Sequence, residues 1–296
     1  MIEINNLTKR FGDLRAVDNL TLAFRPGVTG LVGENGAGKS TLFRCIAGIY
    51  TNIEGSILIG GQPASDIEAK KSLFFLSDTP YFPHGASPKG IANFYKGIAP
   101  LNEGRFFELL NTFGLPLERG IGTYSKGMRR QLFIALALAM ECEYLLMDEA
   151  FDGLDPLVVE KIKGEIIQAG EAGRTVVLSS HNIPVLERLA DRFVLLHKGK
   201  LGKEGESEDI GTEFVKFQGV FKCALTAEML EGLGFEVVSF KKVGSVSHFV
   251  LLDKEGIEER INKAYEPMFL ERIPIDPDEL LVLEMMLAEK GGEKNA

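Results

Sequence analysis

The chain of 296 residues is 45% hydrophobic and has a formal net charge of -9. This length suits one domain of ordinary size and one smaller domain, and the composition is that of a globular protein. The acidic charge argues against nucleic acid as a partner, because phosphate backbones are bound by clustered Lys and Arg.

The pattern over residues 1–204 predicts an α/β core in which helices cover both faces of a parallel sheet. Residues 28–33 form a short apolar run that meets a glycine-rich stretch, and residues 39–49 have apolar side chains at helical spacing. Other apolar runs and helical patterns alternate beyond them, and the region from about 79 to 140 is expected to be a helical subdomain. The further predicted strands are residues 56–59, 144–147 and 175–179, and the further predicted helices are residues 88–98, 105–113, 127–140 and 156–169.

After residue 204 the pattern changes, which predicts a separate C-terminal accessory domain over residues 205–296. A polar stretch comes first, and the order of elements after it is βαββαβ, the order of ferredoxin-like α+β folds. No nucleotide, metal or nucleophile motif occurs in this part. Its predicted strands are residues 214–225, 235–240, 246–252 and 268–273, and its predicted helices are residues 227–233, 257–265 and 278–289.

Three cysteines, Cys45, Cys142 and Cys223, are far apart and have apolar neighbours. We expect three buried thiols in a reducing compartment. The N-terminus has neither the basic nor the apolar region of a secretory signal. The longest apolar run, residues 132–140, is short of the roughly 20 residues that span a bilayer. These features predict a cytosolic protein whose membrane role would come through a partner.

The glycine-rich stretch has the residues and spacing of a phosphate-binding loop between a strand and a helix. Glycines let the backbone amides and the helix N-terminus point at an anion. Lys39 adds a charge for the β- and γ-phosphates, and Ser40 offers a hydroxyl to Mg2+. The stretch therefore predicts a site for ATP with Mg2+, rather than a glycine turn without a ligand. Its residues are Gly33, Glu34, Asn35, Gly36, Ala37, Gly38, Lys39, Ser40 and Thr41.

Two carboxylates, Asp148 and Glu149, end the predicted strand 144–147. Asp148 is placed to hold the Mg2+ shell, and Glu149 to polarise the water that attacks the γ-phosphate. Alone, the pair could equally cap a strand end beside solvent. His181 follows the strand 175–179, where its imidazole could donate to the γ-phosphate. The remaining histidines, His84, His197 and His248, are expected to be solvated turn residues.

The segment Tyr124, Ser125, Lys126, Gly127 and Met128 resembles the signature sequence of the ATP-binding cassette (ABC) ATPases, and the resemblance covers residues 1 to about 204. It implies a P-loop NTPase fold and ATP hydrolysis by a dimer. In the family, the signature of one subunit contacts the γ-phosphate bound by the facing subunit, which implies this role for Ser125 and the amide of Gly127. Phe11 matches the aromatic that stacks on adenine, although it could also be a core residue. Residues 152–155 resemble the loop that crosses the dimer interface, and His181 matches the switch histidine.

Three positions depart from the family pattern. Lys126 stands where glycine is commoner, and Met128 stands where glutamine is commoner. Asp78 aligns with a glutamine that contacts Mg2+ and the attacking water. We retain Asp78 as a predicted Mg2+ contact, although its carboxylate adds negative charge near the triphosphate.

The resemblance implies the ATP-hydrolysing subunit of an ABC transporter, on the cytoplasmic face of the membrane. Its partners would be a transmembrane permease subunit, which determines the substrate, and a second ATP-binding subunit, most simply another copy. The form of the signature is common among single-domain exporter subunits. The alternative is a soluble single-cassette ATPase that acts in assembly, for example of iron-sulfur centres. The aromatic residues of segment 74–98 could be simple core: Phe74, Phe75, Tyr81, Phe82, Phe94 and Tyr95. The resemblance implies instead that a groove here receives a short helix of the permease, with docking residues among Tyr81, Phe82 and Pro83.

Overall fold

The structure is a computed structural model that describes residues 1–180, 185–186, 188–206, 213–275, 279–280, 282–284 and 286–287. The chain divides into two compact units, Met1–Glu204 and Gly205–Ala296, and each has its own sheet and core. Among the helices within these described residues, none combines the length and the apolar character that crossing a bilayer requires.

A six-stranded sheet forms the centre of the first unit, in the order β10-β9-β3-β8-β7-β6. β3 pairs in parallel with β8 and β9, and β7 pairs in parallel with β6 and β8. The loops that follow these parallel strands therefore meet at one edge of the sheet, where the polar residues described below come together. The strands are β3 (Gly27–Val32), β6 (Leu73–Leu76), β7 (Tyr144–Met147), β8 (Thr175–Ser179), β9 (Arg192–His197) and β10 (Lys200–Glu206).

The predictions for β3, β7 and β8 are confirmed, but the assignment of residues 56–59 to the parallel sheet is wrong. This segment belongs to β4, which pairs antiparallel with β1 in a second, four-stranded sheet. Ile57 and Ile59 are buried while Ser56 is exposed, so β4 covers the core with one face only. The second sheet runs in the order β2-β1-β4-β5, with β1 (Ile2–Phe11), β2 (Leu14–Phe24), β4 (Glu54–Ile59) and β5 (Gln62–Pro63).

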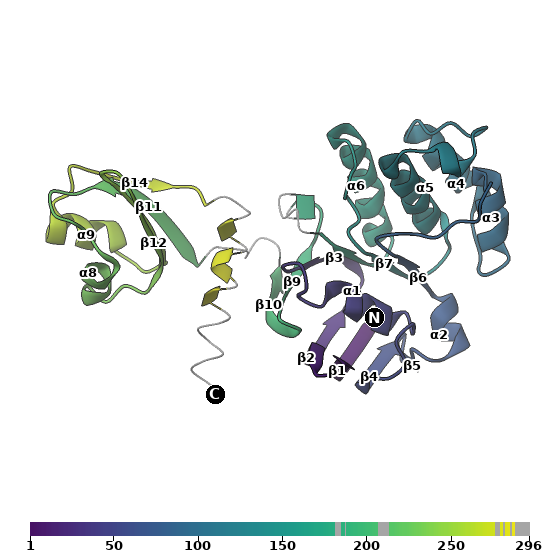
Figure 1. The fold of residues 1–296 in the computed structure, drawn as a ribbon, viewed down its shortest axis with the longest axis horizontal. Helices are drawn as coiled ribbons and strands as arrows, with labels where there is room; N and C mark the ends of the chain where they lie inside the picture. Colours follow the sequence, from purple (N-terminus) through teal and green to yellow (C-terminus); the bar gives the residue numbers. More distant parts are fainter. Residues whose placement is uncertain are drawn as a thin grey trace. The chain divides into compact units, whose positions relative to one another are not determined.

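The core of this unit lies between the two sheets and includes the first helix. Buried Leu42 and Phe43 of that helix pack with Phe24 from the antiparallel sheet and with Leu31 and Val177 from the parallel sheet. The longer helices lie on the other side of the parallel sheet (Figure 1). The predicted helices are confirmed, with ends shifted by up to three residues. The helices are α1 (Lys39–Ile46), α2 (Ile67–Lys71), α3 (Pro88–Lys96), α4 (Glu103–Thr112), the 3-10 turn η1 (Ile121–Thr123), α5 (Lys126–Ala139) and α6 (Pro156–Glu171).

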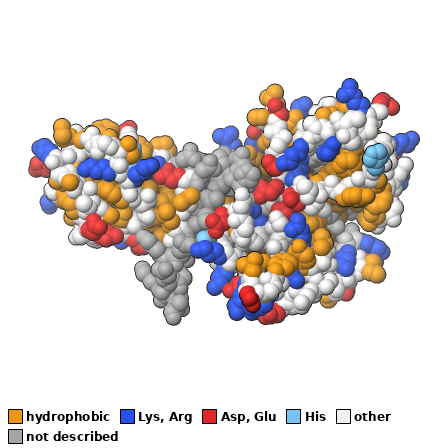
Figure 2. Space-filling model, viewed as in Figure 1, with side chains coloured by type: hydrophobic (Ala, Val, Ile, Leu, Met, Phe, Trp, Pro, Cys, Tyr) orange, Lys and Arg blue, Asp and Glu red, His pale blue; other side chains and the backbone are white. Residues whose placement is uncertain are grey.

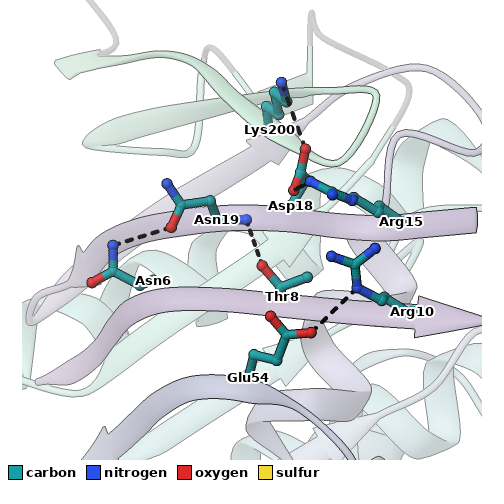
Figure 3. Close-up of polar contacts among 8 residues, drawn as sticks. All are labelled: Asn6, Thr8, Arg10, Arg15, Asp18, Asn19, Glu54 and Lys200. Carbon is teal, nitrogen blue, oxygen red and sulfur yellow. Dashed lines mark hydrogen bonds and ion pairs between the residues drawn. The ribbon is translucent and has the colours of Figure 1, made fainter.

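Polar contacts tie the antiparallel sheet to the β9–β10 turn (Figure 3). Asp18 of β2 accepts a hydrogen bond of 2.9 Å from Arg15 Nη1 and lies 3.6 Å from Lys200 Nζ of β10. The backbone N–H of Asp18 donates to Gly199 O at 2.8 Å, and Gly199 N–H donates to Ala37 O at 3.0 Å. β2 and this turn therefore hold the glycine-rich loop from one side.

The second unit is an antiparallel sheet in the order β12-β13-β11-β14. The predicted order βαββαβ is confirmed, and α8 and α9 pack their apolar side chains into one core with the sheet. The predicted last helix, residues 278–289, lies only partly within the described residues. The elements are β11 (Phe214–Val220), α8 (Ala227–Gly232), β12 (Val237–Val243), β13 (Val246–Leu252), α9 (Ile257–Tyr265) and β14 (Phe269–Ile273).

The expectation of three buried thiols is correct for two of them. Cys45 and Cys142 are buried, whereas Cys223 is exposed. Cys45 lies on the inner face of α1, but Cys223 falls in the loop between β11 and α8, where neighbouring apolar letters do not imply burial.

Candidate nucleotide site

The glycine-rich loop connects β3 to α1 and wraps around the amino end of that helix. Gly38 has φ of 106°, and a Cβ there would lie 2.4 Å from Ala16 O, so only glycine fits. Lys39 is buried, and its Nζ donates to Gly33 O at 2.5 Å and to Glu34 O at 3.1 Å. The ammonium group is thus held over the loop, beside amides that can bind an anion.

The two predicted carboxylates lie beside this loop. Asp148 is fully buried, and its Oδ1 accepts a hydrogen bond of 2.6 Å from Ser179 Oγ. Glu149 is half-buried, with its Oε1 3.9 Å from Lys39 Nζ. Burial lowers the pKa of Lys39, and the carboxylates of Glu149 and Asp148 act in the opposite direction. The structure therefore brings the loop lysine and the strand-end acids into one polar site.

The residues at this site fit a bound Mg2+ ion. Asp148 Oδ2 is buried and has no hydrogen-bond partner among the described residues, so a carboxylate oxygen is left for a cation or a cation-bound water. Ser40 supplies a hydroxyl at the first turn of α1. A hydroxyl and a carboxylate oxygen are ligands of the kind that Mg2+ takes, since it binds few protein groups and shares the rest of its coordination with phosphates and water.

A cleft of about 420 Å³ contains the loop, and Phe11 and Glu149 both line it. The Phe11 side chain is 43% exposed, so it is not a core residue. Its ring packs edge-on against Tyr50 with centroids 5.3 Å apart, and Lys9 Nζ lies 5.0 Å from its centroid. The ring is therefore held in place while it presents apolar surface to the cleft. The lining residues are Phe11, Leu14, Arg15, Ala16, Glu34, Asn35, Gly36, Gly38, Lys39, Ser40, Thr41, Glu149 and Lys198.

Ser125 and Gly127 do not line this cleft; they begin α5. Ser125 is exposed, and its Oγ accepts the Met128 N–H at 3.1 Å as the cap of the helix, so its hydroxyl hydrogen is still available as a donor. At Gly127 a Cβ would lie 2.7 Å from Gly153 O, which leaves no room for a side chain. Lys126 Nζ lies 2.6 Å from Asp152 Oδ2. This ion pair gives a physical reason for a lysine at a position where glycine is commoner.

Asp78 does not line the cleft either. Its Oδ1 lies 3.5 Å from Arg44 Nη2 on α1 and accepts a hydrogen bond of 3.3 Å from Thr79 Oγ1. The carboxylate follows β6 at the same sheet edge as Asp148, but in this structure it is paired with a cation of α1.

The histidine predictions have different outcomes. His181 lies outside the described residues. His84 is in an exposed turn as expected, whereas His248 lies within β13. His197 ends β9 with only 12% of its side chain exposed, and its Nδ1 is 3.5 Å from Glu34 Oε1 of the glycine-rich loop. The expectation of a solvated turn is therefore wrong for His197, because the adjacent turn packs on the loop.

Sequence reasoning missed several residues of the site. Leu14, Ala16 and Lys198 line the cleft from turns and strands that carry no motif. Ser179 and Arg130 contact the Asp148–Glu149 segment. Ser179 gave a signal, because it is a polar residue that ends a buried strand, where a polar group needs a partner. Arg130 gave none, because it stands beside the polar residues Arg129 and Gln131 in the sequence.

Comparisons with known proteins agree with this geometry. The family described as ABC transporter matches residues 17–152. The uncharacterized ABC transporter ATP-binding protein YhaQ of Bacillus subtilis (strain 168) is 32% identical over 73% of this chain and 74% of its own length. The methionine import ATP-binding protein MetN of Clostridium tetani is 32% identical over 78% of this chain and 76% of its own length.

Solved structures show the same fold. An ATP-binding subunit of an ABC transporter has a TM-score of 0.65 and 27% identity, over 71% of this chain and 91% of its own. A dimeric post-hydrolysis state of the ATP-binding cassette MJ0796, bound to ADP and Pi, has a TM-score of 0.62 and 23% identity, over 70% of this chain and 99% of its own.

Proposed function

The chain belongs to the ATP-binding subunits of ABC transporters, which hydrolyse ATP, and we propose that it powers export through a separate transmembrane subunit. In this proposal residues 1–204 are the ATP-binding domain, with a helical subdomain at about 79–140, and residues 205–296 are an accessory domain. The observation that supports the catalytic part is the meeting of Lys39 and Glu149, 3.9 Å apart, at the glycine-rich loop.

The roles of the residues follow from their positions. The loop amides and Lys39 bind the phosphates, and the exposed face of Phe11 stacks on the adenine. Glu149 lies at the phosphate end of the cleft, where its carboxylate orients a water for in-line attack on the γ-phosphate. We also assign His181 to the γ-phosphate from its place in the sequence.

Ser40 and Asp148 would hold Mg2+, and Asp78 is a further proposed contact. The ion, when bound there, would supply positive charge to offset the negative charge that develops on the phosphate oxygens. The buried Asp148 Oδ2 supports this assignment, since a carboxylate oxygen at that depth is otherwise unfavourable.

We propose that a second copy of the chain completes each site. Ser125 and Gly127 lie at the exposed amino end of the 14-residue helix α5, where backbone N–H groups and the helix dipole favour an anion. They are outside the cleft of their own chain, so they would act on the nucleotide bound by the partner. A dimer formed with ATP and opened after hydrolysis would convert the reaction into movement.

The proposed docking surface for the permease surrounds α3. Tyr81, Phe94 and Ile98 are 82%, 57% and 57% exposed, whereas Phe74 is buried and belongs to the core. Figure 2 shows hydrophobic side chains gathered on this part of the molecule. Exposed aromatic and aliphatic groups of this kind favour a protein partner. The complex would lie on the cytoplasmic face of the membrane, where ATP is available.

The catalytic assignment is tested with Glu149→Gln, which keeps the phosphate-binding groups but removes the carboxylate. We expect this variant to bind ATP but to lose steady-state hydrolysis. Turnover at the native rate would refute the role of Glu149. The transport assignment is tested by co-purification of the chain with a polytopic protein from detergent-solubilised membranes. Loss of this association in Tyr81→Glu would support docking at α3. The direction of transport is tested in inside-out membrane vesicles. An exporter should take up its substrate into these vesicles when ATP is added outside them.

A further inference from the structure

Arg130 is a buried cation on helix α5, and its hydrogen bonds go to the backbone of the catalytic segment. The residue is 4% exposed. Its Nη1 donates to Ser77 O at 2.8 Å, and its Nη2 donates to Asp148 O at 3.0 Å and to Glu149 O at 2.9 Å. A planar guanidinium can bind several acceptors at fixed angles, which a lysine cannot do.

The three carbonyl groups come from the ends of two neighbouring strands. Ser77 follows β6, and Asp148 and Glu149 follow β7, which pairs in parallel with β6. Arg130 therefore connects helix α5 to the loops after both strands.

Glu149 has an unfavourable backbone conformation that needs support. Its φ is +48°, in the left-handed region that residues other than glycine seldom adopt. Its N–H donates to Ser179 Oγ at 2.8 Å, and its carbonyl accepts from Arg130. Both polar groups of this residue's backbone are thus anchored, and the direction of the side chain depends on these anchors.

Burial and the neighbouring carboxylates have opposite effects on the charge of Arg130. Burial lowers the pKa of Arg130, while the carboxylates of Asp148 and Asp152 act in the opposite direction. Because an arginine side chain starts from a pKa above the range of cell pH, it stays charged in this setting.

We propose that Arg130 is a positioning residue for ATP hydrolysis: it holds the backbone of Glu149 in the conformation that aims the carboxylate at the attacking water. The proposal rests on the role assigned to Glu149 above. Arg130 acts through the Glu149 backbone, so its loss should lower kcat and leave nucleotide affinity unchanged.

The test compares Arg130→Met with a matched control, Arg174→Met. Arg174 also donates to several carbonyls, including Leu138 O at 3.1 Å and Met140 O at 2.9 Å, but at the opposite end of α5. For Arg130→Met we expect a loss of about 10- to 100-fold in kcat, the size seen when a reacting group is misplaced by about 1 Å. The dissociation constant for ATP should stay within about twofold, and Arg174→Met should keep its kcat. Arg130→Lys keeps the positive charge but not the planar guanidinium, so it should have an intermediate kcat.

A second arm separates positioning from general loss of structure. In a Glu149→Gln background, Arg130→Met should not lower the residual single-turnover rate further, because the carboxylate that it positions is already absent. The proposal is overturned if Arg130→Met lowers the residual rate by the same factor as in the native background. It is also overturned if Arg130→Met and Arg130→Lys both keep native kcat. If Glu149→Gln itself turns over at the native rate, the failure belongs to the assignment of Glu149.

Discussion

Arg44 Nη2 of helix α1 lies 3.5 Å from Oδ1 of Asp78, the second residue after strand β6. This pairing gives the carboxylate of Asp78 a counter-charge. It also means that Asp78 must share or leave Arg44 in order to contact Mg2+. The pair thus allows the proposed metal contact of Asp78 to be separated from a purely structural role.

We predict that Asp78→Asn raises the Mg2+ concentration needed for half-maximal ATPase activity by about tenfold, the usual cost of losing an outer partner of a metal. Arg44→Gln leaves the carboxylate in place and should not raise this requirement. The measurement is a Mg2+ titration of ATPase activity at fixed ATP. An unchanged titration in Asp78→Asn, or an equal shift in both variants, would show that Asp78 serves only as the partner of Arg44.

The second prediction concerns adenine binding. Phe11→Ala should weaken ATP binding about 5- to 150-fold, because stacking of a base on an aromatic ring contributes roughly 1 to 3 kcal/mol. Phe11→Tyr keeps the ring and should bind ATP like the native chain. Calorimetric titration of ATP gives both affinities. Native affinity in Phe11→Ala would mean that the base lies elsewhere in the cleft.

Much of the site could be predicted because its chemistry is local in the sequence. The loop from Gly33 to Thr41, and the acids Asp148 and Glu149, follow apolar strands directly, so periodicity places them at one sheet edge. Lys198 could not be found in this way, since only the turn after β9 brings it to the loop. The partners of Arg130 are carbonyl groups, which every residue has and no residue type reveals.

The strands also divide into those that local sequence predicts and those that it does not. Every residue of the strands 144–147 and 175–179 is buried, and the predicted bounds of both strands equal the observed ones. The strand Leu14–Phe24 was missed, although Leu20, Leu22 and Phe24 are buried and alternate with exposed Thr21 and Ala23. This period of two is the mark of a strand with one buried face, which a search for continuous apolar runs does not detect.

The third prediction concerns how the contribution of Asp18 to stability depends on pH. Asp18 contacts the β9–β10 turn, which holds the glycine-rich loop. The hydrogen bond from Arg15 lowers the pKa of Asp18, and burial acts in the opposite direction. A carboxyl group whose pKa is lowered by folding adds stability above its unfolded pKa, about 4, and this stability is lost as the pH falls through the folded value. Asp18→Asn should therefore lower the melting temperature at pH 7 by about 1 to 3 °C, since Arg15 is half exposed and such pairs are weak.

The difference between Asp18→Asn and the native chain should shrink as the pH falls below about 4, and it should disappear once the pH is below the lowered pKa of folded Asp18. Asp13→Asn, in the exposed turn between β1 and β2, is the matched control and should show no difference at either pH. A deficit of Asp18→Asn that persists unchanged in acid would mean that shape rather than charge supports the turn at Gly199.

The last prediction tests whether a second copy completes the site. Lys39→Ala removes the phosphate-binding ammonium group within the cleft, and Ser125→Asp places a negative charge at the amino end of α5. Aspartate can still accept the Met128 N–H as a helix cap, so α5 should begin where it does in the native chain. Each variant alone should lack ATPase activity, because every site of its dimer has a defect.

An equal mixture of the two variants should recover activity. In a mixed dimer one site receives both substitutions, and the other consists of an intact loop from one copy and an intact Ser125 from its partner. Half of randomly formed dimers are mixed and each has one intact site, so independent sites would give about a quarter of native activity. Activity is measured after the variants are mixed and allowed to exchange subunits. A mixture as inactive as its components would contradict the proposal that Ser125 acts on the nucleotide bound by the partner.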